Sequence, residues 1–525
     1  MLETSIERTV SIADIACQSE VLPRHEAMRW YVWVLVCALV LYFGSCAPGI
    51  LWQDSGLFQY RIWHNDIEGN LGLALSHPLY HMIGIAAKYI PISSFGHRIN
   101  LISAVSAAFA VANVFLLVRL WVGRNMPAAV SAVTLALSHT VWLHASIAEV
   151  YTLYIALFTA ELIFLFKYFQ TGRVGYLYLV GLFNGLSIAN HMWGIIPLGC
   201  YGLLAFVLLV SKRVRFRQLG LIILLWVVGA APYEYLIVRN IFEGGGVSAV
   251  LASAVFGDGW QSTVLNTRLN KLIVLENFMF AVLNFPTPNV LLFLAGCVVL
   301  LKRAPSRSFR NIFLGMLVLF FVFAFRYMVP DRFVFFMPFY CLTAILIGLG
   351  AHILLERTNR RFVSRLVWLF CFFPMAAYIV VPALAQRRAM LQRGREIPHR
   401  NDYTYFLQPW KTRYRGAEDF ANDVFDSVDR NAIVYADGTT LYPLLFAHEI
   451  NGRRQDVTIV SKHGRINNLK DYGLEVVEKS GRPIYVVSPA RGYCPKFLLE
   501  NYDFERDFIL FKGRRKSLNV SKAAQ

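Results

Sequence analysis

Apolar stretches separated by short polar loops fill the chain between residues 30 and 390. A helix needs roughly 20 such residues to cross a hydrocarbon core of about 30 Å. The pattern predicts a polytopic α-helical membrane protein with about eleven transmembrane helices. We expect these near residues 30–46, 99–118, 127–144, 150–167, 175–190, 194–211, 218–238, 286–301, 311–329, 333–354 and 366–385.

Two shorter apolar segments do not fit a crossing. Residues 79–90 end at Pro91, and twelve helical residues extend only about 18 Å. We therefore predict a helix that lies in the membrane interface, within an external loop at 47–98. Residues 272–283 predict a second surface helix, inside a longer external connection at 239–285 that also contains the flexible glycine run 244–246.

The distribution of positive charge gives the predicted orientation. The formal net charge is +18, but its Lys and Arg residues lie in short clusters between spans, which argues against nucleic-acid binding. Loops near 119–124, 167–173, 212–217, 302–310 and 357–365 are rich in Lys and Arg, whereas the loops 145–149 and 191–193 contain none. The positive-inside rule then places residues 1–29 in the cytoplasm and the 47–98 loop outside.

From about residue 398 the composition becomes that of a soluble domain. Residues 431–436, 456–460 and 483–487 predict buried strands, and residues 440–450 predict a helix. We expect residues 398–525 to form a small α/β domain. Eleven crossings from a cytoplasmic start place it outside, in a periplasmic or lumenal compartment. It lacks acids clustered with cations, so we expect it to recognise an acceptor rather than carry the chemistry.

Carboxylates provide the main candidates for chemistry, because only eleven Asp or Glu residues occur between 30 and 390. Asp54 follows the first span and lies between aromatic residues, where an unpaired acid is costly and often functional. Glu149 lies at the external junction between the predicted spans 127–144 and 150–167. It could assist Asp54, or it could simply stabilise the first turn of a helix. Asp66 and Glu68 lie in a polar run and suit a solvated loop.

Candidates for binding an anion lie at the external boundary of the spans. An arginine side chain suits a phosphate diester because it can donate two parallel hydrogen bonds. Each cation alone can also be explained by a long side chain that extends to the headgroup layer. These candidates are Arg61, His77, Lys88, Arg98, His191 and Arg332.

Metal binding has little support in the sequence. His77 and His81 are four residues apart and could share a divalent metal, but no nearby carboxylate completes the set. The eight cysteines show no metal-ligand spacing. We therefore predict no metal site.

The order of these motifs resembles the GT-C superfamily of membrane glycosyltransferases, most closely its protein O-mannosyltransferase-like branch. The similar elements are Asp54, His77-Pro78-Leu79-Tyr80, Arg98, Ala148-Glu149-Val150-Tyr151, Asn190-His191, Asp331-Arg332 and the tail segment from Ala436 to Val457. Two positions depart from the family pattern: Leu79 replaces a second proline, and Leu57 replaces an acid.

The resemblance implies an enzyme that moves a sugar from a polyprenyl-phosphate-linked donor to a hydroxyl of a protein or glycan acceptor. It implies that Asp54 is the general base, that Glu149 assists, and that His77, Lys88, Arg98, His191 and Arg332 hold the donor phosphate. Further candidates are Arg61, Tyr80, Tyr151, Asn190 and Asp331. The resemblance implies no cofactor other than the lipid-linked donor, and no feature of the sequence sets an oligomeric state.

Two other functions stay open at this point. Glu161 lies within the span 150–167 and could mark an ion path, as in a transporter or lipid-sugar flippase. A transporter would typically show paired repeats and broken spans, and no internal repeat is visible. The third possibility is a noncatalytic membrane scaffold that binds glycan or protein through its external domain.

Overall fold

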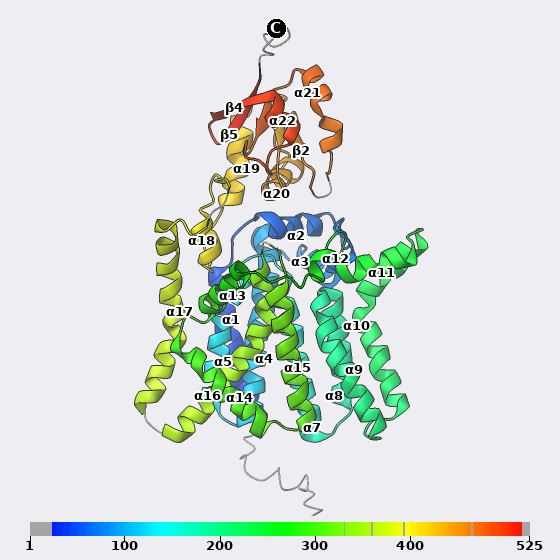
Figure 1. The fold of residues 1–525 in the computed structure, drawn as a ribbon, viewed down its shortest axis with the longest axis vertical. Coiled ribbons are helices and arrows are strands. Elements are labelled where there is room, and N and C mark those ends of the chain that lie inside the picture. Colours follow the sequence, from blue (N-terminus) through cyan, green and yellow to red (C-terminus); the bar gives the residue numbers. More distant parts are fainter. Residues whose placement is uncertain (1–23, 330, 359–360, 392–393, 464–465, 517–525) are drawn as a thin grey trace, which may run out of the picture.

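The computed structural model describes residues 24–329, 331–358, 361–391, 394–463 and 466–516. Most of the predicted segment 1–29, up to residue 23, lies outside the described residues. A bundle of roughly parallel helices forms the larger layer, and a small α/β domain lies beyond one end of it (Figure 1). Short helices fill the space between the two layers.

The bundle is that of a multi-pass integral membrane protein. Within the described residues, eight helices are long and apolar enough to cross a membrane, and two bent helix pairs raise the number to ten. The eight are α1 (Arg24–Ser45), α4 (Phe95–Val122), α7 (Tyr151–Thr171), α9 (Ile195–Val210) with the preceding turn η2 (Met192–Gly194), α10 (Phe216–Phe242), α15 (Arg307–Arg326), α16 (Met337–Thr358) with the preceding turn η4 (Arg332–Phe336), and α17 (Arg361–Arg387).

Three predicted spans differ from simple crossings. The segment 127–144 is broken into α5 (Asn125–Ala136) and α6 (His139–Ala145), which meet at 66°. The segment 286–301 begins as a turn, η3 (Pro288–Leu291), and continues as α14 (Leu292–Arg303) at 110° to the preceding helix α13 (Lys271–Asn284). The helix α8 (Gly175–Asn190) has only 16 residues and packs between α7 and α10.

Small residues allow the central helices to approach closely. Five alanines of α4 are fully buried against its neighbours, Ala104, Ala107, Ala108, Ala110 and Ala112. At the crossing of α14 and α16, a Cβ atom on Gly350 would lie 1.9 Å from the carbonyl oxygen of Leu292. This crossing therefore requires glycine, as is common where membrane helices pack by contact between backbones.

The segment 47–98, which the sequence predicts as an external loop, contains more helix than expected. The expected interfacial helix is present as α3 (Pro78–Ala87), and a second helix, α2 (Gln53–Trp63), precedes it with the turn η1 (Leu73–Leu75) between them. Both helices lie at the end of the bundle nearest the α/β domain (Figure 1). At the same end lie α11 (Val247–Phe256), α12 (Gln261–Val264) and α13, which occupies the position of the second predicted surface helix.

The C-terminal domain is a five-stranded sheet with short helices. The strand order is β2-β1-β3-β5-β4, in which β1 is parallel to β2 and β3, while β5 is antiparallel to β3 and β4. The three parallel strands lie within the predicted ones, whereas the hairpin of β4 and β5 was not predicted. The elements are α18 (Asp402–Leu407), α19 (Gly416–Ser427), β1 (Ile433–Tyr435), α20 (Leu441–Leu445), η5 (Phe446–Ile450), β2 (Thr458–Val460), η6 (Leu469–Tyr472), α21 (Leu474–Ser480), β3 (Ile484–Val486), α22 (Lys496–Asn501), β4 (Tyr502–Asp507) and β5 (Leu510–Arg515).

The helix α2 and the C-terminal domain share one hydrophobic core. Trp52 and Phe58 are buried together with Phe420 and Leu441 of the domain, and the rings of Trp52 and Phe420 lie 5.2 Å apart. Burial of large aromatic side chains stabilises such contacts by about 1.5–3 kcal/mol each. The position of α2 is therefore fixed by both layers of the molecule.

Candidate active site

Asp54 lies in the first turn of α2, where the helix dipole favours a negative charge. The residue before it, Gln53, has a left-handed backbone with φ 53°, an uncommon conformation for a residue other than glycine. The Gln53 N–H donates a hydrogen bond of 3.3 Å to the carbonyl of Thr439 in the C-terminal domain. Backbone strain that is held in place by other contacts often accompanies functional sites.

Glu149 is held between two helices of the bundle and α2. It lies in the short connection between α6 and α7, and only 7% of it is exposed. The Ser103 hydroxyl of α4 accepts from the Glu149 N–H and donates to its carbonyl oxygen, both at 2.9 Å. The Ser55 hydroxyl donates to the Glu149 carboxylate at 3.3 Å, so the residue after Asp54 contacts the second candidate acid directly.

Three carboxyl groups lie close enough here for the charge of Asp331 to act on the other two. Burial, followed by the charge of Asp331, raises the pKa of Asp54 to about 7, although its side chain keeps access to solvent. Burial, followed by the charges of Asp54 and Asp331, raises the pKa of Glu149 well above its ordinary value. Burial also raises the pKa of Asp331, which precedes η4. The structure thus brings Asp54, Glu149 and Asp331 together, and such groups are suited to exchange protons near neutral pH.

A pair of stacked imidazoles adjoins the carboxylates. The rings of His77 and His191 lie 5.2 Å apart with an angle of 15° between their planes. His77 Nδ1 donates to the carbonyl of Asn190 at 2.8 Å, and the Asn190 side chain donates to the carbonyl of Val150 at 2.9 Å. The Tyr151 ring lies 5.5 Å from that of His191. These contacts join the start of α3 and the end of α8 to the segment that carries Glu149.

Both imidazoles are neutral at neutral pH. Burial lowers the pKa of His77 to about 4 and that of His191 well below its ordinary value. His191 Nδ1 accepts a hydrogen bond of 3.1 Å from the Trp193 N–H, so its proton resides on Nε2. His191 can therefore donate a hydrogen bond to an anion but contributes no formal charge. His77 adopts a left-handed backbone with φ 49° at the start of α3, a second strained position beside the carboxylates.

The predicted cations do not converge on one point. Lys88 donates to Asn65 Oδ1 at 2.5 Å and to the Trp63 carbonyl at 3.0 Å, where it caps the end of α2. Arg98 donates to the carbonyls of Lys88, at 2.7 Å, and of Ile90. Ten residues of α3, about 15 Å of helix, separate these two cations from His77.

The remaining two predicted cations are occupied by acids or carbonyls. Arg332 is 4% exposed and forms an ion pair with Glu276 of α13. Arg61 donates to the carbonyl of Ser76 at 2.9 Å and lies 3.9 Å from the Asp66 carboxylate. Burial lowers the pKa of Arg61 to about 10.

An apolar groove begins at Arg98. It has a volume of about 400 Å³, and side chains from α1, α3, α4 and α7 line it, among them Phe43, Ile83, Phe109 and Leu153. Arg98 is the only charged residue among its lining residues, and its buried Nε has no hydrogen-bond partner within the described parts of the chain. Leu153, which lines the groove, follows Glu149 by four residues.

Several residues at this site were not predicted from the sequence. The Trp52 indole N–H donates to the Tyr414 hydroxyl at 2.6 Å, and the Arg400 guanidinium lies 5.6 Å from the centre of a Trp52 ring. The Tyr60 hydroxyl donates to the Glu449 carboxylate at 2.5 Å. Roughly 350 to 390 residues separate the members of each pair, so no local pattern could reveal them. The aromatic residues between 403 and 414, which include Tyr405 and Trp410, were the available signal.

Two other sets of polar contacts help to hold the site in place. The Gln59 side chain donates to Asn100 Oδ1 at 2.9 Å, and the Asn100 side chain donates to the carbonyls of Ala47 and Gly49, both at 2.9 Å. The buried Tyr80 hydroxyl lies 3.4 Å from the Ser103 hydroxyl that positions Glu149. No group of three His, Cys, Asp or Glu residues in the described ranges is arranged to hold a metal ion.

Comparisons with known proteins show similarity in part of the sequence and in the fold. Residues 74–214 match the family model "Protein O-mannosyl-transferase TMEM260 N-terminal domain", which includes His77, Glu149 and His191 but not Asp54 or Asp331. No curated protein matches the chain. The fold is similar to that of ArnT from Cupriavidus metallidurans bound to undecaprenyl phosphate, with TM-score 0.57 and 16% identity over 93% of this chain and 98% of that one.

The same protein in its apo state gives a TM-score of 0.56, with the same identity and coverage. An oligosaccharyltransferase from Archaeoglobus fulgidus in its apo form gives 0.47, with 15% identity over 94% of this chain and 75% of that one. The family match and the fold confirm the predicted resemblance to the GT-C superfamily and its protein O-mannosyltransferase-like branch.

Proposed function

We propose that this membrane protein, which has the fold of GT-C glycosyltransferases, transfers a sugar from a polyprenyl-phosphate-linked donor to a hydroxyl of a protein or glycan on the outer face. The observation that carries the proposal is the convergence of Asp54, Glu149 and Asp331 beside His77 and His191. This group lies at the bundle end that faces the C-terminal domain. The basic loops lie at the opposite end, which supports a cytoplasmic position for that end.

Asp54 is the proposed general base. With a pKa of about 7, its carboxyl is partly ionised at neutral pH and can accept the proton of the acceptor hydroxyl. As this proton moves to Asp54, the acceptor oxygen forms a bond to the anomeric carbon. The bond between that carbon and the phosphate oxygen breaks, and the phosphate leaves with the electron pair. Burial and the neighbouring carboxylates raise the pKa of Glu149 well above its ordinary value, which favours its protonated form, so it orients the reactants by hydrogen bonding.

The apolar groove is the proposed position of the polyprenyl chain. Its lining is apolar except for Arg98, whose unpartnered Nε can donate a hydrogen bond to a phosphate oxygen. Lys88 lies beside Arg98 and adds positive charge. His77 and His191 stack on each other beside the carboxylates, and Arg332 follows Asp331 in the chain, so these three residues can contact the sugar or its leaving phosphate. The candidate phosphate-binding residues therefore form two groups, instead of the single cluster expected from the sequence.

The C-terminal domain offers a place for the acceptor. A cavity of about 590 Å³ lies where β1 and β2 end, and its lining includes Asp437, Ser461, His463 and Tyr493. Ligands of parallel α/β sheets characteristically bind beyond the carboxyl ends of the strands. Asp437 is two residues from Thr439, whose carbonyl contacts Gln53. An acceptor in this cavity would therefore lie near the start of α2, which supports a role of the domain in acceptor recognition.

The surroundings of Glu161 argue against a transporter. Its carboxylate accepts hydrogen bonds from Ser187 at 2.5 Å, Tyr201 at 3.0 Å and Asn184 at 3.3 Å. The residue is completely buried, so these donors tie α7 to α8 and α9. An acid satisfied in this way holds helices together, and it needs no role in moving ions.

The test is sugar transfer by purified protein in liposomes that contain a polyprenyl-phosphate sugar. Asp54→Asn preserves size but cannot accept the proton, so turnover should fall by about 10²–10⁴-fold, or roughly 3–5 kcal/mol of barrier. Donor affinity should stay within a factor of about two. Asp66→Asn is the matched control, because an Asn can still accept the hydrogen bonds that the Glu68 and Gly69 N–H groups donate to Asp66 Oδ1. Unchanged turnover in Asp54→Asn would refute the general-base assignment.

A further inference from the structure

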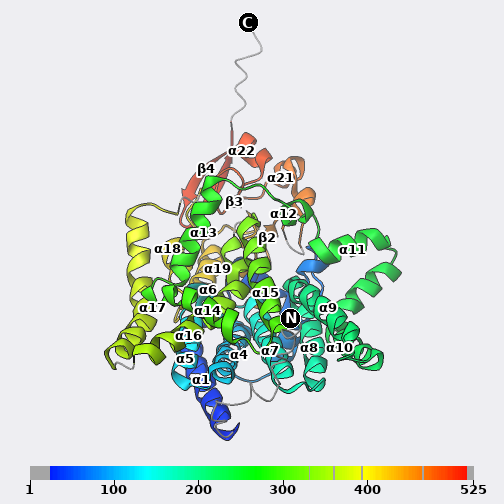
Figure 2. The same ribbon diagram turned by 60° about the horizontal axis from the view of Figure 1, so that its bottom comes forward.

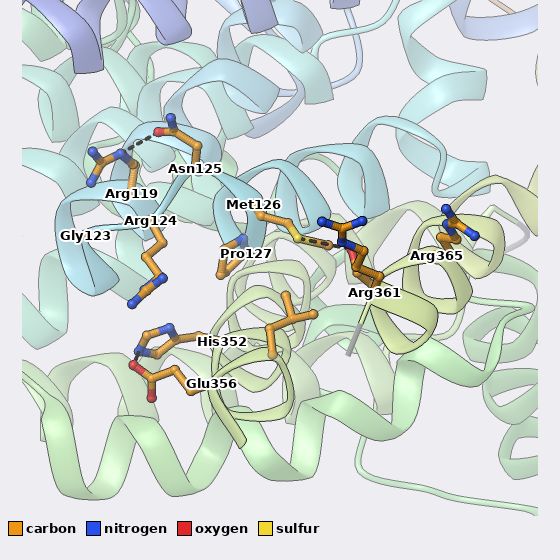
Figure 3. Close-up of a pocket in the computed structure, with 12 residues that line it drawn as sticks. Arg119, Gly123, Arg124, Asn125, Met126, Pro127, His352, Glu356, Arg361 and Arg365 are labelled. Carbon is orange, nitrogen blue, oxygen red and sulfur yellow. Dashed lines mark hydrogen bonds and ion pairs between the residues drawn. The ribbon is translucent and has the colours of Figure 1, made fainter. Parts of the chain in front are cut away.

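A large cavity lies at the bundle end opposite the carboxylates and has no part in the proposed reaction. Its volume is about 870 Å³. The end of α4, the start of α5, the end of α16 and the start of α17 surround it (Figure 3). The ends of α5, α16 and α17 also lie close together when the lower end of the molecule is turned forward (Figure 2). Met126, Pro127 and Leu355 give it a partly apolar wall.

The charges that line the cavity are predominantly positive. Arg119 and Arg124 lie on the side of α4 and α5, and Arg361 and Arg365 lie on the side of α17 (Figure 3). Among the described residues, the only acid in the lining is Glu356. Its carboxylate is already engaged by His352 at 3.2 Å and by Arg303 at 3.4 Å. The lining therefore has a surplus of positive charge that its own acid does not neutralise.

The four arginines differ in how they are held. Arg119 is 5% exposed, and its Nε donates to Asn125 Oδ1 at 2.6 Å, which fixes the guanidinium at the cavity wall. The charge of Glu26 of α1 also acts on Arg119. Arg124, Arg361 and Arg365 are exposed and form no ion pair with any residue in the described ranges. One fixed and three adaptable guanidinium groups can surround an anion from several sides.

Two further groups favour an anion in the cavity. The helix α5 begins here with Arg124 at its N-cap, and no side chain caps its first N–H groups. Such groups and the positive end of the helix dipole attract phosphate. His352 is 5% exposed, and its Nδ1 has no hydrogen-bond partner among the residues that the structure describes. A buried polar atom without a partner is costly unless a ligand or water satisfies it.

The general excess of Lys and Arg in cytoplasmic loops explains positive charge at this end, but it requires neither a cavity nor a buried arginine. Basic pockets between transmembrane helices are typical sites for phosphate-bearing lipid headgroups. We propose that this cavity binds a phosphate-bearing anion, with its oxygens on Arg119, Arg124, Arg361 and Arg365. The ligand would link α4 and α5 to α17. Only 28% of the apolar stretch of α17 is buried against the rest of the protein.

The experiment measures thermal unfolding of the full-length protein, purified free of lipid in an uncharged detergent. Dioctanoyl phosphatidylglycerol, dioctanoyl phosphatidylcholine, inorganic phosphate and pyrophosphate are titrated separately. The pocket variant is Arg361→Gln with Arg365→Gln, both exposed positions. The control is Arg213→Gln with Arg217→Gln, which removes the same charge from exposed positions just before α10 and in its first turn, at the same end of the bundle. A basic residue near an anionic headgroup is worth about fivefold in affinity, so two should be worth about 30-fold.

We expect phosphatidylglycerol to raise the unfolding temperature and phosphatidylcholine to have no such effect. The pocket variant should need about 30-fold more phosphatidylglycerol for the same effect, whereas the control should respond as the unmodified protein does. Stabilisation by phosphate or pyrophosphate with the same loss in the pocket variant would assign the site to a soluble phosphate ligand. Equal losses in the pocket and control variants, or no stabilisation by any of the phosphates, would overturn the proposal.

Discussion

The charge of Asp331 should shift the pH at which the protein becomes active as the proposed glycosyltransferase. If Asp54 is the general base, kcat/KM should rise with pH and reach half its maximum near the pKa of Asp54, about 7. The substitution Asp331→Asn removes the negative charge that is the second cause of this high pKa. Loss of a neighbouring negative charge favours the ionised carboxylate, so the pKa falls and the activity rises at lower pH.

The expected size of this effect follows from the order of the causes. The pKa of Asp54 rises from 3.8 to about 7, and burial is the larger cause, so Asp331 accounts for less than half of this difference. The Asp54 side chain keeps access to solvent, which screens the charge further. We expect the acidic limb to move by about 0.5–1 pH unit, to a midpoint between about 6 and 6.5.

The assay is the pH dependence of kcat/KM for sugar transfer in liposomes, because this ratio reports groups of the free enzyme. A donor phosphodiester does not titrate in the range used, so it does not contribute to the limb. The variant Asp66→Asn makes the same chemical change at an acid that is not a cause of the Asp54 shift, and its limb should stay in place. A limb that is unmoved in Asp331→Asn, or that moves to higher pH, would show that Asp331 does not act on the base.

Three other predictions concern the groove, the contact between domains and the orientation. Arg98→Ala should weaken donor binding by about 1.5–3 kcal/mol and Arg98→Lys should restore only part of it, measured by donor titration; equal affinity in all three proteins would remove Arg98 from the donor site. Tyr414→Phe leaves the buried Trp52 N–H without its acceptor, so the protein should lose about 1–3 kcal/mol of stability, visible as a lower unfolding temperature. The control is Tyr403→Phe, at a residue whose hydroxyl contacts Leu391, and this variant should lose less stability. Cysteines at the exposed residues Ser211 and Ser480 should react with a membrane-impermeant reagent from the cytoplasmic and external sides respectively, and the reverse result would invert the orientation.

The membrane part of the fold could be predicted because a bilayer imposes a simple length rule on apolar helices. The fold class is confirmed, and the short segment 79–90 forms α3, a helix of ten residues that is too short to cross a bilayer. The bends at 136–139 and 284–288 could not be predicted in this way. Composition reports whether a segment is apolar, but the angle between two helices depends on packing with distant neighbours.

The helix α2 illustrates what local patterns do not contain. Its sequence has the acid Asp54, a glycine and several polar residues, and it resembles a solvated loop when judged alone. It is a helix because its faces are buried against two partners that lie far away in the sequence, the start of α4 and the C-terminal domain. Tertiary packing can override weak local preferences in this way.

The candidate residues show the same division. Sequence order brought attention to Asp54, Glu149, His77 and His191, and the structure places these in one region. The predicted joint action of Lys88, Arg98 and Arg332 on one phosphate depended on distances that the sequence does not give. A positive charge near a helix end can bind a ligand or a backbone carbonyl equally well, and Lys88 and Arg98 both contact carbonyls.

Contacts along α2 join the C-terminal domain to the helix that carries the proposed base, in addition to the domain's proposed role in acceptor recognition. Thr439 binds the backbone of Gln53 at the start of the helix, and Glu449 binds Tyr60 near its end. Between these two contacts, Ser55 of the same helix donates to Glu149. A shift of the domain would therefore move Asp54 relative to Glu149, and a displacement of about 1 Å at a catalytic group can cost about 10²-fold in rate. An acceptor that fixes the position of the domain against α2 would, by the same contacts, bring Asp54 into position.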